Sequence, residues 1–259
     1  MIETELSIPE FVSKWTEEKK VVWEGDRLLE VRDNTRELRE KMAMASKVCL
    51  IVVGPSGSGK DKLIENLDPE CFESVKTATT RPNDRTVEQE KDPYIRMTKE
   101  EMLILDDNGK GDFVEITDYV DFYYGTYRPE IERALATGKI PIFKVDWKGA
   151  LILQERQLGG ERVFKDMALV VLFICPTDCN RLAKNMIKRD VWGRVKEVSR
   201  NQAMTRVKKK MLQAEVDLGA MKEVAHFIAV NEFGDENLKE LVMEVETLLL
   251  GTLPLTGKY

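Results

Sequence analysis

The stretch from residue 48 to residue 67 constrains the fold more than any other part of this chain. Residues 48–53 form a short, uninterrupted apolar run rich in β-branched side chains, which is typical of a strand buried on both faces of a parallel sheet. The motif GPSGSGKD follows at residues 54–61, and residues 62–67 have the apolar spacing of a helix start. Strand, glycine-rich turn and helix in this order predict a phosphate-binding loop.

The residue types of this loop suit a polyphosphate ligand. Backbone N–H groups bind phosphate oxygens when the chain wraps closely around them, and glycine permits that approach. Lys60 adds a positive charge at the β- and γ-phosphates, and the helix that starts here directs the positive end of its dipole toward the anion. We therefore expect these residues to hold the phosphates of ATP: Gly54, Pro55, Ser56, Gly57, Ser58, Gly59, Lys60 and Asp61.

The position after Lys60 departs from the usual pattern, which has Ser or Thr there to hold Mg²⁺. Asp61 can also ligate Mg²⁺, directly or through water, but its carboxylate adds negative charge beside a triphosphate. Two interpretations stay open from the residues alone. Asp61 is a magnesium ligand, or it marks a loop that has lost its function.

Composition limits the classes of partner. The formal net charge of −6 disfavours binding to a nucleic-acid polymer. The four cysteines show no metal-ligand spacing, and free thiols suit a reducing cytoplasm. The longest apolar run, residues 167–175, is too short to span a bilayer, and the N-terminus lacks a signal-peptide pattern. We expect a cytoplasmic protein that binds small-molecule nucleotides and no membrane. The oligomeric state stays open.

The order of the apolar segments predicts the architecture. Further buried strands are expected at residues 140–146, 167–175 and 227–231, and helical patterns alternate with them. This alternation favours an α/β protein of the P-loop NTPase fold, a parallel sheet flanked by helices. The expected domain spans residues 47–251. It is preceded by a mostly helical extension, residues 1–46, in which Asn34 and Glu37 cap a helix, and followed by a tail, residues 252–259.

A second motif adds a family resemblance. The TTRP stretch that ends at Pro82, at this distance behind the GPSGSGK loop, resembles guanylate kinases. The resemblance implies that Arg81, Arg85 and Tyr94 bind the phosphate of the acceptor GMP, with Thr77 in the same site. A guanidinium suits this task because it is planar and permanently charged. Arg85 matches the family arginine only if one residue is inserted before it.

Two more segments match the family's base-binding pattern. An acid at Glu115 precedes a YGT turn that contains Tyr124 and Thr126. The resemblance implies that Glu115 and Thr126 face the guanine base and that Tyr124 joins the acceptor-phosphate group. A carboxylate is chemically apt, because it accepts hydrogen bonds from the N1–H and exocyclic amine of guanine, a pair that adenine lacks.

The family's paired acids, D-x-D, correspond here to Lys144 and Asp146. Asp146 matches the second acid, which the family uses at the base or the metal end of the site, and we assign it to the base. Lys144 replaces the first acid with a cation. One explanation is a local exchange of charges between Lys144 and Asp61.

The segment from residue 176 to residue 210 contains eleven Lys and Arg against three Asp and Glu, a local charge of +8. Such a block suits an anion, and the resemblance identifies it as the lid, residues 178–206. Lid arginines neutralise the phosphoryl group in transfer, a role implied here for Arg189 and Arg206. We expect the remaining lysines to form a solvated helix face. Asn231 resembles the family asparagine near the donor adenine.

Together these features predict transfer of the γ-phosphoryl of ATP to GMP or dGMP with Mg²⁺, with an acceptor-binding region at residues 77–127. Two alternatives stay open. The loop GPSGSGKD also resembles ribose 1,5-bisphosphate phosphokinase, whose acceptor is a sugar phosphate. The departures Asp61 and Lys144 favour a guanylate-kinase-like interaction module that has lost catalysis, whereas the intact loop and the basic lid weigh against it.

Overall fold

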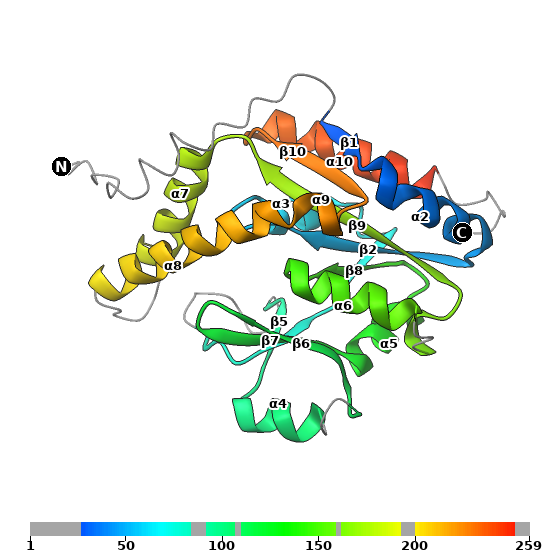
Figure 1. Cartoon of the computed structure of the whole chain (residues 1–259), viewed down its shortest axis with the longest axis horizontal. Coiled ribbons are helices and arrows are strands. Elements are labelled where there is room, and N and C mark those ends of the chain that lie inside the picture. The colour runs from blue at the N-terminus through cyan, green and yellow to red at the C-terminus, as the bar shows by residue number, and fades with distance from the viewer. Residues whose placement is uncertain (1–26, 84–91, 107–109, 159–161, 193–199, 252–259) are drawn as a thin grey trace.

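The computed structural model describes residues 27–83, 92–106, 110–158, 162–192 and 200–251. Within these ranges the chain forms a six-stranded sheet, a four-stranded sheet and helices packed around both (Figure 1). The predicted α/β fold, a parallel sheet flanked by helices, is confirmed. Arg85 and the expected tail at residues 252–259 lie outside the described residues.

The larger sheet has the strand order β1-β10-β9-β2-β8-β3. Five of these strands are parallel to their neighbours, and β1 pairs antiparallel with β10. The four strands predicted from apolar runs are all present, as β2, β8, β9 and β10. The bounds are β1 Leu28–Glu30, β2 Lys47–Val53, β3 Phe72–Ser74, β8 Ile140–Lys144, β9 Met167–Pro176 and β10 Phe227–Asn231.

Helices cover both faces of this sheet. In Figure 1, α2 and α10 lie on one side of it, and α5 and α6 lie on the other. The helices of the described residues are α2 Arg32–Met44, α3 Lys60–Asn66, α4 Lys99–Asp106, α5 Arg128–Ala136, α6 Trp147–Leu158, α7 Cys179–Ile187, α8 Arg200–Gly219, α9 Met221–Val224 and α10 Asp235–Leu250. A 3₁₀ turn lies at Arg162–Phe164, and a π-helical turn at Lys188–Trp192 continues α7.

The central strand β2 shows why this sequence forms a two-sided sheet. Side chains alternate across a strand, and here both faces of β2 are apolar. Cys49, Ile51 and Val53 pack in one core with residues of α5 and α6, whereas Leu50 and Val52 pack in a second core with α2, α3 and α10. Each fully buried aliphatic side chain stabilises the fold by about 1.5–3 kcal/mol, so the strand that carries the glycine loop is firmly anchored.

The smaller sheet has the order β5-β4-β7-β6 and contains the region predicted to bind the acceptor. Its bounds are β4 Thr77–Thr79, β5 Tyr94–Arg96, β6 Phe113–Tyr119 and β7 Phe122–Tyr127. Helix α4 packs on it through Met102, which shares a small core with Ala78 and Phe113. At its start, Thr98 and Glu101 exchange hydrogen bonds between side chain and backbone, of 2.6 and 3.1 Å, which is a capping box.

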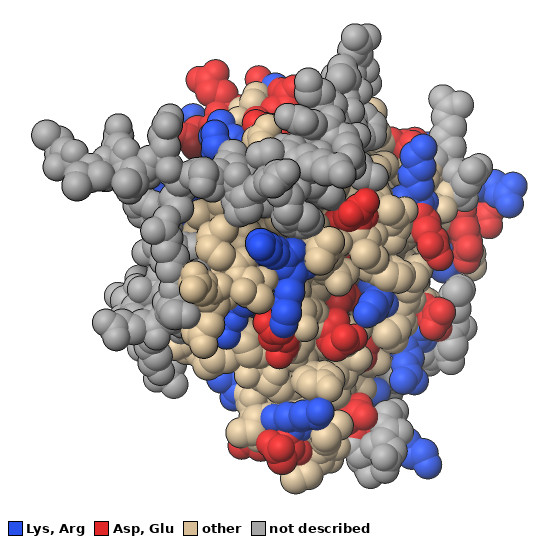
Figure 2. Space-filling view, turned by 60° about the vertical axis from the view of Figure 1, so that its left-hand side comes forward, with Lys and Arg blue, Asp and Glu red and all other residues tan. Residues whose placement is uncertain are grey.

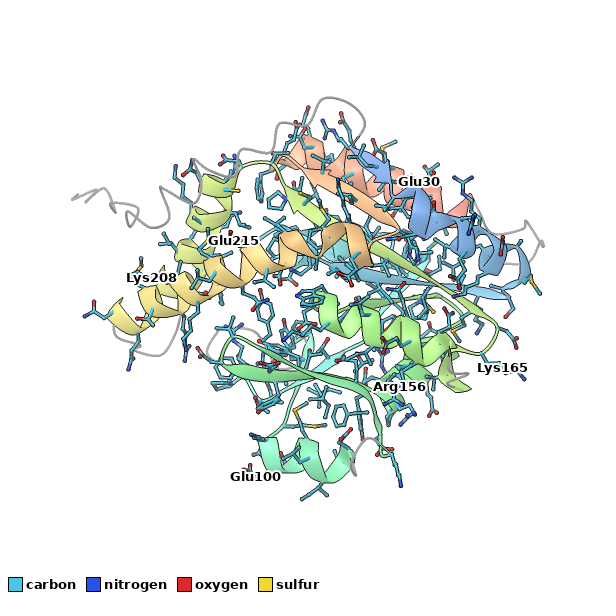
Figure 3. All side chains as sticks on the ribbon, in the orientation of Figure 1. Glu30, Glu100, Arg156, Lys165, Lys208 and Glu215 are labelled. Atoms are coloured by element: carbon cyan, nitrogen blue, oxygen red, sulfur yellow. The ribbon has the colours of Figure 1, made fainter. Side chains whose placement is uncertain are left out.

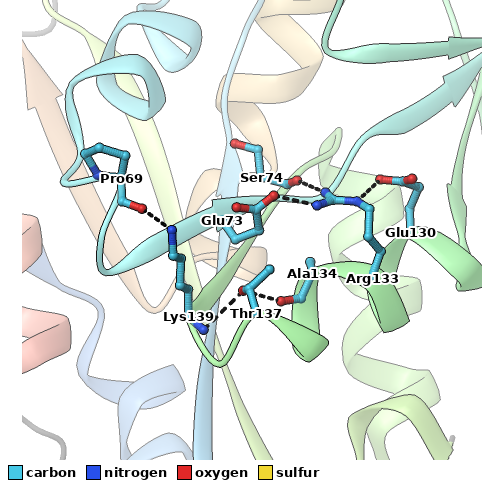
Figure 4. Close-up of polar contacts among 8 residues, drawn as sticks. All are labelled: Pro69, Glu73, Ser74, Glu130, Arg133, Ala134, Thr137 and Lys139. Atoms are coloured by element: carbon cyan, nitrogen blue, oxygen red, sulfur yellow. Dashed lines mark hydrogen bonds and ion pairs between the residues drawn. The ribbon is translucent and has the colours of Figure 1, made fainter. Parts of the chain in front are cut away.

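The edge strand β3 is tied to α5 by one arginine (Figure 4). Arg133 donates to the carboxylate of Glu73 at 2.6 Å, to the backbone oxygen of Ser74 at 2.8 Å and to Glu130 at 2.9 Å. Lys139 donates to the backbone oxygen of Pro69 at 2.6 Å just before the strand. Satisfying edge carbonyls in this way blunts the pairing potential of a sheet edge.

Part of the predicted N-terminal extension belongs to the main core. Strand β1 completes the sheet, and Leu38 of α2 is buried in the core that contains β2. Asn34 does not cap its own helix, contrary to the expectation, because the N-cap position is Val31. Its side-chain amide instead donates to the Ala225 oxygen at 2.6 Å and to the Lys222 oxygen at 3.0 Å, which satisfies carbonyls at the end of α9.

The carboxyl ends of β2, β8 and β10 meet at one edge of the sheet, beside the smaller sheet and the α7–α8 segment. Ligands of open parallel sheets bind outside these strand ends. Among the described helices, none combines the length and the apolar character that crossing a bilayer requires.

Candidate active site

A cleft of about 700 Å³ opens at this sheet edge. It brings together most of the site residues predicted from the sequence, although they come from widely separated parts of the chain. Those that line it are Gly54, Ser56, Gly57, Gly59, Lys60, Asp61, Thr77, Arg81, Tyr94, Glu115, Tyr124, Asp146, Arg189, Arg206 and Asn231. Pro55, Ser58 and Thr126 lie behind this lining and contact it through hydrogen bonds.

The glycine loop has the backbone conformation that the phosphate-binding interpretation requires. Gly59 has φ +104°, and a Cβ there would lie 2.3 Å from the side-chain nitrogen of Asn231. That nitrogen donates to the Ser58 oxygen at 2.6 Å, and the Asn231 oxygen accepts from the Phe233 backbone at 2.9 Å. Asn231 therefore braces the loop, a role that the sequence analysis did not assign to it.

Lys60 points back into the loop. Its ammonium donates to the backbone oxygen of Gly54 and, at 2.8 Å, to that of Pro55. Burial lowers the pKa of Lys60 to about 8, and the neighbouring Asp61 opposes this shift. An anion that enters the loop would compete with two uncharged carbonyls for this ammonium, which favours the anion.

The two departures from the family pattern contact each other. Lys144 Nζ lies 2.8 Å from Asp61 Oδ1, so the exchange of charges that the sequence suggested is present. Burial opposes ionisation of Asp61, yet Lys144 holds the pKa of that carboxyl well below its ordinary value. The pair links the end of β8 to the first turn of α3.

The opposite end of the cleft contains two carboxyl groups on the smaller sheet and on the loop before α6. Thr126 Oγ1 donates to Glu115 Oε1 at 2.5 Å, while Glu115 Oε2 is buried and has no hydrogen-bond partner among the described residues. Asp146 Oδ1 accepts from the Gly149 backbone at 2.7 Å. Burial raises the pKa of Glu115 to about 8 and raises that of Asp146 in the same direction. This end suits a flat ligand that donates hydrogen bonds.

An aromatic and cationic group also lines the cleft. The rings of Tyr94 and Tyr124 meet edge to face, with their centroids 6.1 Å apart. Burial raises the pKa of Tyr124, and a hydrogen bond with Arg81 opposes the shift. Arg96 fixes the Arg81 segment by donating to the Arg81 backbone oxygen at 2.8 Å and to Asp92 at 2.9 Å. Hydroxyl and guanidinium donors at this point suit a phosphate.

The lid contributes further cations. Arg189, on the π-helical turn, donates to the hydroxyl of Ser56, so the lid contacts the glycine loop directly. The guanidinium carbon of Arg206 in α8 lies 5.5 Å from the centroid of the Phe122 ring. Its Nε lies 4.0 Å from Oδ2 of Asp121, at the tip of the β6–β7 hairpin. The lid thus contacts both the glycine loop and the smaller sheet.

Two buried charges of the lid were not predicted from the sequence. Lys210 was expected on a solvated face, but its ammonium is buried and pairs with Asp190, which is fully buried. The expectation holds for Lys208, which is exposed and points outward from α8 (Figure 3). The burial of Lys210 depends on the π-helical turn, which places Asp190 against α8. No local sequence pattern predicts such a turn.

A second missed group joins the acceptor region to the lid. Tyr119 of β6 donates to Asp217 of α8 at 3.2 Å, and Gln213 donates to the same carboxyl group at 2.9 Å. Burial raises the pKa of Asp217 to about 6. Tyr119 and Asp217 are 98 positions apart, so spacing along the chain could not reveal their contact.

Comparisons with known proteins agree with this geometry. A family model described as guanylate kinase matches residues 46–246. A guanylate kinase of Clostridium perfringens is 31% identical over 209 residues, which is 78% of this chain and 82% of that protein. One of Mycoplasma genitalium is 28% identical over 197 residues, 74% of this chain and 72% of that protein. The crystal structure of guanylate kinase from Anaplasma phagocytophilum superposes with a TM-score of 0.54 at 22% identity, covering 82% of this chain and 90% of that one.

Proposed function

Since this chain belongs to the guanylate kinase family, we propose that it transfers the γ-phosphoryl group of ATP to GMP or dGMP, producing ADP and the nucleoside diphosphate. The observation that carries the choice of acceptor is the buried, unpartnered Oε2 of Glu115. Glu115 lines the same cleft as the phosphate-binding loop. Guanine supplies two adjacent N–H donors, which such a carboxylate can accept.

The base end is pre-arranged for guanine. Thr126 holds one oxygen of Glu115, which leaves the other for the ligand. Asp146 stands close enough to raise the pKa of Glu115 further, so the two carboxyl groups share one pocket. Adenine would place a lone pair at N1 against a carboxylate, and the unmatched buried group would be costly. We assign Glu115, Thr126 and Asp146 to the base.

The acceptor phosphate lies, in this proposal, between the base end and the loop. Arg81, Tyr94 and Tyr124 offer a guanidinium and two phenol hydroxyls there, and Thr77 lines the same part of the cleft. The Thr77 hydroxyl donates to the backbone oxygen of Lys144 at 3.3 Å. Arg85 remains a prediction from the resemblance.

The donor side holds ATP through the loop amides of residues 54–60 and the Lys60 ammonium. Arg189 and Arg206 are proposed to neutralise the phosphoryl group in transfer, because both line the cleft from the lid and Arg189 contacts Ser56 of the loop. Phosphoryl transfer depends mainly on positioning and charge, which explains why the site needs cations more than a strong base. Asn231 supports this side by bracing Ser58.

Magnesium is the cofactor we propose beside ATP, and Asp61 fits a role as its ligand. Its side chain is half exposed to the cleft next to Lys60, and only Oδ1 is engaged, by Lys144. The oxygen Oδ2 takes part in no hydrogen bond with the described residues. Mg²⁺ would neutralise charge on the β- and γ-phosphates. Asp61 would orient it, directly or through water.

The two alternatives receive less support from the site. A sugar-phosphate acceptor gives no reason for the paired carboxyl groups Glu115 and Asp146. An inactive binding module was favoured by Asp61 and Lys144, but these residues neutralise each other in an ion pair. The contact of Arg189 with Ser56 joins the lid to the loop, as phosphoryl transfer requires.

Partners other than small nucleotides are not proposed. On the face that carries α7 and α8, Lys and Arg side chains alternate with Asp and Glu and form no broad basic surface among the described residues (Figure 2). A mixed surface and a net charge of −6 argue against a nucleic-acid polymer. All four cysteines are free thiols, and the cytoplasm is the location we propose.

The test is phosphoryl transfer from ATP with Mg²⁺, with GMP, dGMP, AMP, UMP, dTMP and ribose 1,5-bisphosphate offered separately. Lys60→Ala is the matched inactive control. Turnover on GMP or dGMP that disappears in the control supports the proposal. Transfer to another acceptor would retain the donor site and overturn the assignment of Glu115, whereas no transfer to any acceptor would favour the binding module.

A further inference from the structure

Lys144 occupies a position between the donor and acceptor halves of the cleft. It is the last residue of β8, and it pairs in register with Val52 near the start of the glycine loop. Its ammonium lies 2.8 Å from Asp61 Oδ1 on one side. On the other side it lies 4.6 Å from the centroid of the Tyr94 ring.

These two neighbours belong to different half-sites. Asp61 directly follows Lys60, the lysine proposed to bind the donor phosphates. Tyr94 packs on Tyr124, which is hydrogen-bonded to Arg81 on the proposed acceptor-phosphate side. A phosphoryl group that passes from donor to acceptor must cross the space between these half-sites. The Lys144 ammonium already stands there.

The ion pair of Lys144 with Asp61 is open to solvent on the Asp61 side. The Asp61 side chain is 51% exposed, and an ion pair with so exposed a partner contributes little. A phosphate group carries more negative charge than a carboxylate and has three acceptor oxygens, so it competes well for the same ammonium.

We propose that Lys144 is a catalytic residue of this chain, which leaves Asp61 when both nucleotides are bound and contacts the phosphoryl group during transfer. The proposal rests on the proposed kinase function. It assigns a new role to a position where the family pattern has an acid. It also explains the paired departures, since Asp61 holds the ammonium in place while the site is empty.

The step balances without any proton transfer by Lys144. An oxygen of the acceptor phosphate forms a bond with the γ-phosphorus, and the bond from that phosphorus to the β–γ bridging oxygen breaks. The bridging oxygen keeps the electron pair and leaves on ADP. Lys144 stays an ammonium throughout and donates hydrogen bonds to the oxygens on which charge is spread in the transition state.

The experiment compares Lys144→Met and Lys144→Gln with the wild-type protein and with the control Lys165→Met. Glutamine keeps a hydrogen-bond donor for Asp61 without the charge. Lys165 is exposed and lies at the far end of the molecule from the lid helix α8 (Figure 3). Circular dichroism and thermal unfolding establish that each variant folds. Kinetics use the acceptor that wild-type protein phosphorylates, and calorimetry measures the binding of ATP, of GMP and of a bisubstrate analogue that joins adenosine and guanosine through five phosphates.

We expect both Lys144 variants to lower kcat about 100-fold or more, the usual effect of removing one donor to a developing charge. The KM of each nucleotide and the affinity for each alone should change less than about threefold, whereas the affinity for the bisubstrate analogue should fall about 100-fold. A pattern of this kind identifies an interaction made only when both half-sites are occupied. Lys165→Met should match wild type in every measurement.

Three results would overturn the inference. The first is a kcat of the Lys144 variants within about threefold of the wild-type value. The second is a loss of affinity for ATP alone that accounts for the whole loss of activity. The third is recovery of activity in the double variant Asp61→Asn, Lys144→Met. The last result would mean that Lys144 serves only to neutralise Asp61. Failure of the proposed function is distinct, because wild-type protein itself would then transfer no phosphoryl group to GMP.

Discussion

Thr126 Oγ1 donates a 2.5 Å hydrogen bond to Glu115 Oε1 and thereby fixes the orientation of a buried carboxyl group on a residue that lines the cleft. The two residues face each other across the β6–β7 ladder, in register. The carboxyl group cannot turn without losing this bond. A single orientation of the unpartnered oxygen is what recognition of a guanine edge requires.

The first prediction concerns Glu115→Gln. The amide keeps the shape of the side chain, but it removes the negative charge and sets an N–H₂ group against the N–H donors of guanine. A hydrogen bond to a charged group contributes about 1.5–3 kcal/mol, so KM for GMP should rise by about tenfold to 150-fold. Steady-state kinetics at saturating ATP measure the KM for GMP. KM for ATP should stay near the wild-type value, and the exposed Glu132→Gln is the matched control. An unchanged KM for GMP would contradict the role of Glu115.

The second prediction is a pH dependence of GMP binding. Burial raises the pKa of Glu115 to about 8 in the empty site, so the carboxyl group is mostly protonated at pH 7. Guanine needs the carboxylate, and its affinity should therefore rise with pH, approaching tenfold per unit below pH 8 and levelling above it. Calorimetry with GMP alone between pH 7 and 8.5 measures this slope. Glu115→Gln should show a flat profile, and a flat wild-type profile would count against the assignment.

The third prediction has the opposite sign on the donor side. Burial lowers the pKa of Lys60 to about 8, so the empty protein loses this positive charge as the pH rises above that value. ATP needs the ammonium, so its affinity should fall above pH 8 by up to tenfold per unit. Binding at pH 8.5 should also take up a proton, which calorimetry in buffers of different ionisation enthalpy detects. Lys60→Met should bind ATP weakly at every pH, with no proton uptake. An ATP affinity that rises with pH would refute this account.

The fold was predictable where a local sequence pattern specifies the secondary structure. The run at residues 48–53 and the glycines after it specify strand, loop and helix within twenty residues, because burial on both faces and positive φ angles leave few alternatives. Strand β1 was not predictable in the same way. It has three residues, and its place depends on pairing with β10, almost two hundred positions away.

The lining of the cleft was predictable where a residue belongs to a local sequence motif, and less so where two charges distant in the sequence meet. The family resemblance identified Glu115, Tyr124 and Arg81, and the structure places all three on the cleft. Spacing along the chain cannot show that Asp190 buries Lys210, because that contact depends on a π-helical turn. The Asp61–Lys144 ion pair was suggested by the sequence, because two residues that depart from the family pattern carry opposite charges.

The fourth prediction separates two roles of Asn231. The resemblance placed it near the donor adenine, but its amide donates to the Ser58 oxygen and braces the loop. Asn231→Ala leaves that carbonyl without its donor, which costs about 1–3 kcal/mol. If bracing is its task, affinity for inorganic tripolyphosphate and for ATP should fall by the same factor, as calorimetry can measure. A loss confined to ATP would mean that Asn231 serves the adenine instead. The nearby Asn237→Ala is the control.

The last prediction concerns stability rather than catalysis. His226 precedes β10, and its Nδ1 accepts a 2.9 Å hydrogen bond from the backbone N–H of Val171. The bond requires Nδ1 to be unprotonated, and burial lowers the pKa of His226 to about 4 from 6.5. The unfolded chain therefore binds more protons between these values, and the free energy of unfolding must fall as the pH drops from 6.5 toward 4.

His226→Asn removes the titration but keeps an oxygen acceptor near the position of Nδ1. From pH 7.5 to pH 5, wild-type protein should lose about 2 kcal/mol more stability than the variant, given about 1.4 kcal/mol per pKa unit. Urea unfolding followed by circular dichroism at both pH values measures the difference. Carboxyl groups contribute equally to the pH dependence of wild-type protein and variant, so the difference between the two proteins isolates the contribution of His226. Parallel losses in the two proteins would show that the histidine is not the group that couples folding to pH.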